Sequence, residues 1–175
     1  MLGSMNTHLD GPFMSARPKP TSEPADFAEL HVDQQLCLAL QTSSSLITRL
    51  YRRLLGPLGL THPQYLVLIA LWEFERPMTM GDLGDRLSMD TGSLTPLVKR
   101  METAGLVSRK RDTRDERRVW VEPTAKGSSL RDDVLSVRRE VVRQLPVTGE
   151  QIAALRRLLQ DMNEALVQAD ADQPR

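Results

Sequence analysis

The spacing of apolar residues predicts helices along most of the chain. Between Leu36 and Leu55 apolar side chains recur at helical intervals, and Gly56 followed by Pro57 marks the end of that helix. The next segment, THPQYLVLIALWEF, begins with Thr61 as a candidate N-cap and is apolar on nearly every side. The first pattern is typical of an amphipathic helix, and the second of a helix buried in a core.

Two shorter helices are predicted next, each preceded by a residue that caps helices well. Thr79 precedes the segment MGDLGDRLSM, and Asp90 precedes TGSLTPLVKRMETAGL, in which Gly105 closes the helix. This layout predicts a helix-turn-helix.

The pattern then changes from helical to extended and back again. β-prone stretches at 106–108 and 119–121 flank a charged middle that contains turn formers, which predicts a β-hairpin. After Thr124 two helical stripes follow, separated by Pro146. The stripes are Leu130, Val134, Val137, Val141 and Leu145, and then Ile152, Leu155, Leu158, Leu159, Met162 and Leu166. The predicted fold class is mainly α with a small β-hairpin.

The two ends of the chain are predicted to differ from its middle. Residues 1–26 combine prolines with Gly, Ser and Thr and show little apolar periodicity, so we expect a flexible tail. Amphipathic helices around a compact middle often pair with a second copy of the chain, although a monomeric helical core uses the same pattern. These features predict dimerisation helices at residues 27–60 and 124–170, around a middle region at 61–123.

Composition narrows the possible functions. The chain of 175 residues suffices for one domain, and Lys plus Arg at 23 equals Asp plus Glu at 23, so net charge gives no general reason to expect nucleic acid or an anionic membrane. The longest apolar run, YLVLIALW, is far shorter than the roughly 20 residues that cross a bilayer, and no signal peptide is evident. We expect a cytoplasmic protein without membrane contact.

Cys37 is the only cysteine in the sequence. A single thiol excludes an intrachain disulfide and a cysteine zinc cluster, and neither a metal nor a cofactor is expected. A lone cysteine on an apolar helix is most often a small hydrophobic residue, so composition alone leaves its role open.

The predicted hairpin is locally basic. Between Ser108 and Arg118 cations outnumber anions in a chain whose total charge is zero, although a solvated loop accounts for such a run equally well. Its position favours a function, because a helix with short polar side chains, DTGSLTP, directly precedes it. Such a helix can enter the major groove of DNA while a cationic hairpin follows the backbone or reaches the minor groove. Together the two elements predict a winged helix-turn-helix that binds double-stranded DNA.

These residues also carry a family resemblance. The segment DTRDERRVWVEPTAKG resembles the wing signature of the MarR family of bacterial regulators, D-x-R-D-x-R followed by a strand and L-T-x-x-G, with Pro123 in place of the usual leucine. Upstream, LGLTHPQYLVLIALWE and LGDRLSMDTGSLTPLVKRMETAGLVSRKRD are similar to the OhrR-type repressors, the subgroup that senses organic hydroperoxides. The resemblance runs from about Leu36 to Gly127. The matching wing positions are Asp112, Arg114, Asp115, Arg117, Thr124 and Gly127.

The resemblance implies a homodimer on a pseudo-palindromic operator. Side chains near the start of the second helix of the helix-turn-helix should lie nearest base edges, and cations further along should contact phosphate. Arg117 holds the wing position that the family inserts into the minor groove. The expected DNA-binding residues are Thr91, Ser93, Thr95, Pro96, Lys99 and Arg100 on the helix, with Arg114, Arg117 and Arg118 on the wing.

The resemblance also assigns a role to Cys37. The subgroup carries its peroxide-sensing cysteine in QLCFxLY near the start of the first long helix, and this chain has QLCLALQ. Peroxide reacts with the thiolate, which the N-terminal turn of a helix favours, and the product is a sulfenic acid. We therefore expect Cys37 to be the redox sensor.

A tyrosine later in the same helix, here Tyr51, is the implied partner of this thiol. At about 1.5 Å per residue Tyr51 lies roughly 21 Å along the axis from Cys37, so the tyrosine must come from the other subunit. Without the family pattern, ordinary core is the favoured explanation of Tyr51. The subgroup has tyrosines where this chain has Gln41 and His62. His62 is either a replacement donor, an imidazolium that stabilises the thiolate, or a solvated residue at a helix start.

Three functions are compatible with the sequence. The first is a dimeric repressor that releases its operator when an organic hydroperoxide oxidises Cys37, after which a low-molecular-weight thiol caps the sulfenic acid or oxidation proceeds further. The second is a repressor relieved by a small aromatic or phenolic ligand, with Cys37 only structural. The third, a thiol enzyme, is disfavoured because His8, His31 and His62 are the only histidines and none lies in a cysteine-hydrolase motif.

Overall fold

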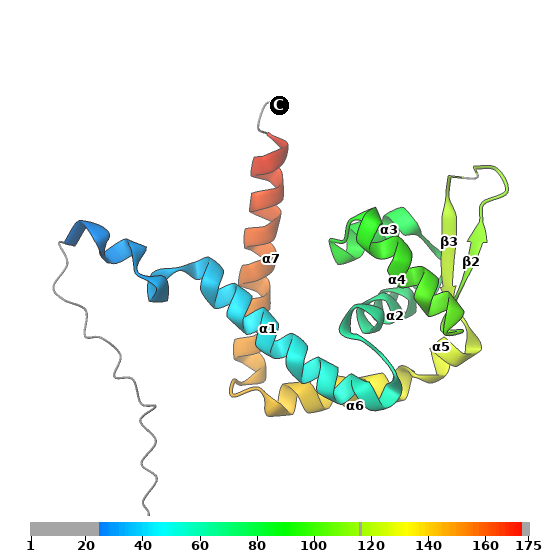
Figure 1. Cartoon of the computed structure of the whole chain (residues 1–175), viewed down its shortest axis with the longest axis horizontal. Coiled ribbons are helices and arrows are strands. Elements are labelled where there is room, and N and C mark those ends of the chain that lie inside the picture. Colours follow the sequence, from blue (N-terminus) through cyan, green and yellow to red (C-terminus); the bar gives the residue numbers. More distant parts are fainter. Residues whose placement is uncertain (1–24, 116, 173–175) are drawn as a thin grey trace, which may run out of the picture. The chain divides into compact units, whose positions relative to one another are not determined.

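A computed structural model describes residues 25–115 and 117–172 (Figure 1). The chain divides into two compact units, 1–43 and 44–175, with the boundary inside the first long helix. The N-terminal unit holds η1 (Ala25–Leu30), η2 (Val32–Gln34) and the start of α1 (Leu36–Leu55). The second unit holds the rest of α1 and then η3 (Gly56–Leu58), α2 (His62–Phe74), β1 (Met78–Thr79), α3 (Met80–Leu87), α4 (Thr91–Thr103), β2 (Val107–Arg111), β3 (Val119–Pro123), α5 (Ala125–Ser129), α6 (Arg131–Gln144) and α7 (Gly149–Ala171).

The predicted helix starts are confirmed, because side chains cap them locally. The Thr79 hydroxyl accepts a hydrogen bond from the Asp82 amide at 3.1 Å, and the Asp82 carboxylate accepts one from the Thr79 amide at 2.9 Å. Asp90 accepts from the Ser93 amide at 2.9 Å, which starts α4. The first cap fixes the start of α3, and the second lies at the turn between α3 and α4.

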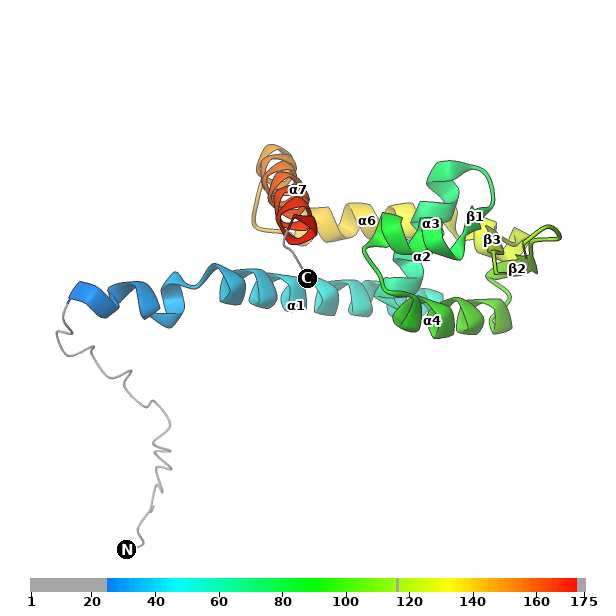
Figure 2. The same cartoon turned by 90° about the horizontal axis from the view of Figure 1, so that it is seen from above.

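A three-stranded antiparallel sheet in the order β1-β3-β2 completes the winged helix. Val107 pairs with Pro123 and Arg111 with Val119, so the hairpin is longer than the β-prone stretches predicted. β1 was not predicted, and it adds Met78 to the sheet opposite Val121. The β2–β3 connection projects from the helices, and α4 runs along one edge of the helical layer (Figure 2). The fold class, mainly α with a winged helix-turn-helix, is confirmed.

The core of the second unit is built around α2. Val67 and Leu68 of α2 are fully buried, and they belong to one apolar cluster with Leu83 of α3, Val98 of α4 and Val121 of β3. The nearly continuous apolar sequence of α2 is explained by this central position. No single described helix is long and apolar enough to cross a membrane. Two consecutive segments, Leu36–Leu58 and His62–Phe74, are together long and apolar enough, but the chain bends by 76° between them. The second of these segments is the core helix α2.

Gly127, just after the wing, packs closely against the backbone of the loop that follows α4. A Cβ atom at Gly127 would lie 2.0 Å from the carbonyl oxygen of Leu106, so no other residue fits without moving the backbone. The Thr124 hydroxyl donates to the Gly105 carbonyl at 2.6 Å and accepts from the Gly127 amide at 3.0 Å. The chain after β3 is thereby held next to the loop that precedes β2.

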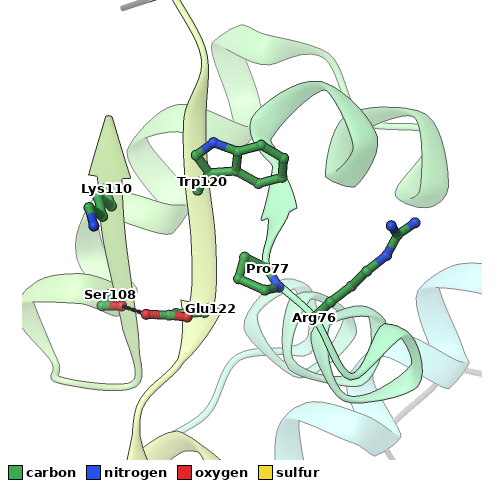
Figure 3. Close-up of a pocket in the computed structure, with 6 residues that line it drawn as sticks. All are labelled: Arg76, Pro77, Ser108, Lys110, Trp120 and Glu122. Carbon is green, nitrogen blue, oxygen red and sulfur yellow. Dashed lines mark hydrogen bonds between the residues drawn. The ribbon is translucent and has the colours of Figure 1, made fainter. Parts of the chain in front are cut away.

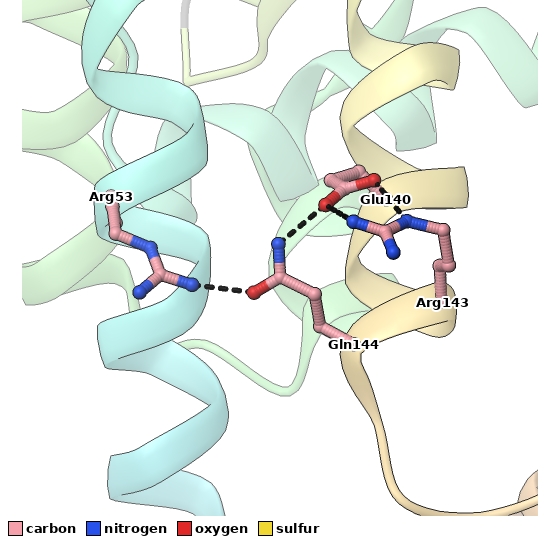
Figure 4. Close-up of polar contacts among 4 residues, drawn as sticks. All are labelled: Arg53, Glu140, Arg143 and Gln144. Carbon is pink, nitrogen blue, oxygen red and sulfur yellow. Dashed lines mark hydrogen bonds and ion pairs between the residues drawn. The ribbon is translucent and has the colours of Figure 1, made fainter.

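α6 packs on the core of its own chain. Val134 and Val141 of α6 are buried, and the Arg131 guanidinium lies over the Trp72 ring and donates to the Trp72 carbonyl at 3.2 Å. A polar chain also joins α6 to α1: Arg53 donates to Gln144, and both Gln144 and Arg143 donate to Glu140 (Figure 4). The Arg143 hydrogen bonds lower the pKa of Glu140 to about 2.

α7 has no buried residue, although its apolar stripe resembles that of α6. The side chains of Leu158 and Val167 are 66% and 71% exposed. In the N-terminal unit, the apolar Phe27, Leu30 and Leu36 are also exposed. The flexible tail predicted for residues 1–26 lies outside the described residues up to residue 24, and η1 begins inside its predicted span, at Ala25.

Candidate DNA-binding surface and redox site

α4 presents two different faces. Its inner face is formed by buried apolar residues, Leu94, Leu97, Val98 and Met101. The residues predicted to contact DNA lie on the other side: Thr91, Ser93, Pro96, Lys99 and Arg100 are exposed, and Thr95 is half-buried. The structure thus brings all six predicted helix residues onto one accessible surface.

The hydroxyl of Ser93 already has a partner. It donates to the Asp90 carboxylate at 2.7 Å, and the Ser93 hydroxyl and amide together hold the pKa of the Asp90 carboxyl below its usual range. A hydroxyl has one proton and two lone pairs, so in this conformation Ser93 can only accept a hydrogen bond from another group. On DNA this conformation would suit an exocyclic amine of cytosine or adenine.

The wing tip is organised by two aspartates. One Asp112 oxygen accepts from the amides of Arg114 at 2.7 Å and Asp115 at 3.1 Å, and the other accepts from the Trp120 indole N–H at 2.7 Å. These hydrogen bonds, led by that of Trp120, hold the pKa of the Asp112 carboxyl below its usual range. Asp115 accepts from the Arg117 amide at 3.1 Å. The acidic residues of the basic hairpin therefore shape the loop that carries its arginines.

The wing arginines differ in their surroundings. Arg114 and Arg117 are exposed at the tip, whereas the Arg118 guanidinium lies 5.7 Å from the centre of the Trp120 ring. Arg109 forms a salt bridge of 2.7 Å to Glu102 of α4, which ties the base of the wing to the candidate DNA-binding helix. Asp112 was expected from the wing signature, but the roles of Trp120 and Glu102 were not, because a hydrogen bond and an ion pair between separate elements leave no local pattern in the sequence.

A groove of about 480 Å³ lies on the outer face of the sheet, away from the core (Figure 3). Ser108 and Lys110 of β2 lie opposite Glu122 and Trp120 of β3, and the Ser108 hydroxyl donates to Glu122 at 3.1 Å. Arg76 and Pro77, before β1, form its other wall. No lining residue belongs to α4, so this groove is separate from the candidate DNA-binding helix.

Cys37 and Gln41 lie in the N-terminal unit, in the first turns of α1. Both side chains are exposed in the single chain. Among the described residues no group of His, Cys, Asp and Glu is arranged to hold a metal ion.

Tyr51 and His62, both predicted pocket residues, lie together with Tyr65 in the second unit. The Tyr51 and His62 ring centres are 4.7 Å apart, and the hydroxyl oxygens of Tyr51 and Tyr65 are 3.3 Å apart. His62 is half-buried, and burial lowers its pKa, so the neutral imidazole is favoured. Tyr65 was not singled out from the sequence, because it begins an apolar run that reads as core.

Comparison with known proteins identifies the family. Residues 60–119 match the MarR family. The organic hydroperoxide resistance transcriptional regulator of Bacillus subtilis (strain 168) is 37% identical over 142 residues, which cover 81% of this chain and 96% of that protein. The chain belongs to the MarR family.

Two further proteins are similar to this chain. The HTH-type transcriptional regulator TtmR of Methylorubrum extorquens (strain PA1) is 40% identical over 135 residues, covering 77% of this chain and 69% of TtmR. The structure of reduced AbfR bound to DNA, a protein of Staphylococcus epidermidis, matches with a TM-score of 0.70 and 28% identity, covering 81% of this chain and 96% of AbfR. Because its sequence relatives are regulators, this MarR chain is a transcriptional regulator and not an enzyme.

Proposed function

We propose that this MarR regulator is a dimeric repressor that leaves its operator when an organic hydroperoxide oxidises Cys37. The observation that carries the proposal is the single thiol in the first turns of α1, in a chain 37% identical to an organic hydroperoxide resistance regulator. The exposure of Cys37 in one chain leaves its thiol open to contact with a second subunit.

Operator binding is assigned to α4 and the wing. Six predicted contact residues share the accessible face of α4, and Arg114 and Arg117 stand at the tip of a loop held by Asp112. AbfR, whose fold this chain shares, is known bound to DNA. Two such heads in a dimer would read a pseudo-palindromic site.

Dimerisation is assigned to α7 and the exposed apolar residues of α1. Leu155, Leu158 and Leu166 of α7 are more than half exposed, and no residue of this helix is buried. A second copy supplies cover of the same chemistry, as in obligate dimers with apolar interfaces. In such a dimer Tyr51 would donate a hydrogen bond to the thiolate of Cys37 of the partner subunit, while Gln41 and His62 replace subgroup tyrosines and make the pocket more polar.

The chemical step uses the thiolate of Cys37 as the nucleophile. Its sulfur attacks one peroxide oxygen, an S–O bond forms, the O–O bond breaks, and the alkoxide takes a proton from water and leaves as an alcohol. Sulfur loses two electrons and the peroxide gains them, which gives a sulfenic acid. With one cysteine in the chain, this product then forms a mixed disulfide with a low-molecular-weight thiol or is oxidised further. AbfR has been solved in reduced, overoxidised and disulfide forms.

Mass analysis tests the chemistry directly. After one equivalent of cumene hydroperoxide, intact protein should gain one oxygen at Cys37, and added small thiol should convert that species into a mixed disulfide. If Cys37 stays reduced while DNA binding falls, the aromatic or phenolic ligand mechanism replaces this one.

A further inference from the structure

The tyrosine that the proposed sensor uses is held by a second tyrosine from α2. Tyr51 lies near the end of α1, and its ring centre is 5.0 Å from that of Tyr65 with the ring planes tilted by 43°. The Tyr65 hydroxyl is the described hydrogen-bond partner of the Tyr51 hydroxyl, at 3.3 Å. These are the only two tyrosines in the chain, so the two phenols form one isolated pair.

The direction of hydrogen bonding in this pair follows from the number of protons. Each hydroxyl carries one proton and accepts on its oxygen. If Tyr51 donates its proton to a thiolate, the bond between the two tyrosines must run from the Tyr65 proton to the Tyr51 oxygen. The separation of 3.3 Å is long for a hydroxyl pair, so the hydrogen bond from Tyr65 orients Tyr51 but is a weak one.

The surroundings keep Tyr65 a donor. Tyr65 is 3% exposed, and burial, followed by the hydrogen bond with Tyr51, raises its pKa far above the usual range. Arg138 of α6 acts in the opposite direction and is the smaller effect. His62, stacked 5.8 Å from the Tyr65 ring centre, has a lowered pKa and is mainly neutral at pH 7. Tyr65 therefore stays protonated across the pH range in which a thiol reacts.

We propose that Tyr65 is a positioning residue for the redox reaction, whose hydroxyl donates to Tyr51 and so directs the Tyr51 proton toward Cys37 of the partner subunit. This inference rests on the proposed function, because it assumes that Tyr51 assists the oxidation of that thiol. A donor that is itself hydrogen-bonded through its oxygen is polarised and donates more strongly. Tyr65 would thus favour the reactive thiolate without touching it.

The test is a double-mutant cycle on the full-length dimer. The rate of Cys37 oxidation by cumene hydroperoxide is followed by mass analysis in wild type, Tyr51→Phe, Tyr65→Phe and the double variant. Loss of one hydrogen bond of this kind should slow oxidation about fivefold in each single variant. Since Tyr65 acts only through Tyr51, the double variant should be no slower than Tyr51→Phe alone. The pH at which iodoacetamide alkylates Cys37 half-maximally should rise in the same three variants, which packing alone would not cause.

The outcomes separate this inference from the proposed function. If Tyr51→Phe slows oxidation and Tyr65→Phe does not, Tyr65 has no positioning role and the sensor remains. Additive slowing in the double variant would also overturn the inference, because Tyr65 would then act independently. If all four proteins leave Cys37 reduced, the proposed function itself fails.

A spectroscopic measurement does not depend on the folding of Tyr65→Phe. In Tyr51→Phe, Tyr65 is the sole tyrosine, so its Raman doublet reports its own hydrogen bonding. Loss of the Tyr51 acceptor should move the doublet away from the donor state present in wild type. An unchanged Tyr65 contribution would show that Tyr65 does not donate to Tyr51.

Discussion

α2 and α7 are both rich in apolar residues, but only α2 buries them within the chain. Leu68 of α2 is 0% exposed, whereas Leu158 of α7 is 66% exposed. α2 is enclosed by α3, α4 and the sheet of its own unit, whereas no residue of α7 is buried. The winged helix therefore contains its own core, whereas the exposed apolar surface of α7 is the one that we propose packs against a second copy of the chain.

The same substitution, leucine to alanine, should change the free energy of unfolding by different amounts in α2 and in α7. Leu68→Ala should lower the free energy of unfolding by about 2–5 kcal/mol, because it leaves a cavity in a closed core. Leu158→Ala should alter the stability of a single chain by less than about 0.5 kcal/mol. Urea denaturation of both variants at several protein concentrations measures the two effects. If both variants lose the same free energy of unfolding at every protein concentration, the two helices do not differ in the way proposed.

A charge on α7 should break the dimer without unfolding the winged helix. Leu158→Glu would bury a carboxylate in an apolar interface and should weaken dimerisation about a hundredfold. Sedimentation velocity at micromolar concentration measures the change, and Glu164→Gln on the same helix is the control. The wild type should sediment as a dimer; a wild-type monomer would count against the assignment of α7.

The surface of the winged helix should affect DNA binding and leave its core intact. Arg117→Ala should weaken operator binding by about 1–3 kcal/mol if the wing enters the minor groove, while the melting temperature stays that of wild type. Fluorescence anisotropy with operator DNA provides the measurement, and Lys126→Ala, outside the wing tip, is its control. Unchanged affinity at physiological salt would exclude the wing from operator recognition.

Lys99 on α4 should have the smallest and least sequence-specific effect. Lys99→Ala should lower affinity for all sequences and reduce the slope of log affinity against log salt concentration by about 1, as expected for one lost phosphate contact. Titrations at four salt concentrations with operator and scrambled DNA measure both. A change in base preference at constant slope would place Lys99 at a base edge instead.

Local signals made the helices predictable, whereas pairings between distant residues were missed. Thr61, Thr79 and Asp90 lie at the predicted starts of α2, α3 and α4, because a cap depends on residues within one turn. β1 was missed, since two residues carry no periodic signal and their pairing with β3 depends on the tertiary fold.

The sequence predicted which residues belong to the candidate site better than it predicted how their side chains are arranged. The exposed face of α4 followed from periodicity, but the bond from Ser93 to Asp90 and the bond from Trp120 to Asp112 depend on side-chain geometry. Tyr65 was not predicted as a site residue, because its apolar sequence context gives no sign that its hydroxyl contacts that of Tyr51. Sequence spacing identifies a face of a helix, and only the fold identifies which polar atoms meet there.

Cys37→Ser separates oxidation of this thiol from every other cause of operator release. Serine is close to cysteine in size and does not react with peroxide, so the variant should fold, dimerise and bind operator with nearly wild-type affinity. Operator binding is titrated for both proteins with and without a few equivalents of cumene hydroperoxide. Wild type should leave the DNA on oxidation, and Cys37→Ser should stay bound. Release of Cys37→Ser by the hydroperoxide would contradict it.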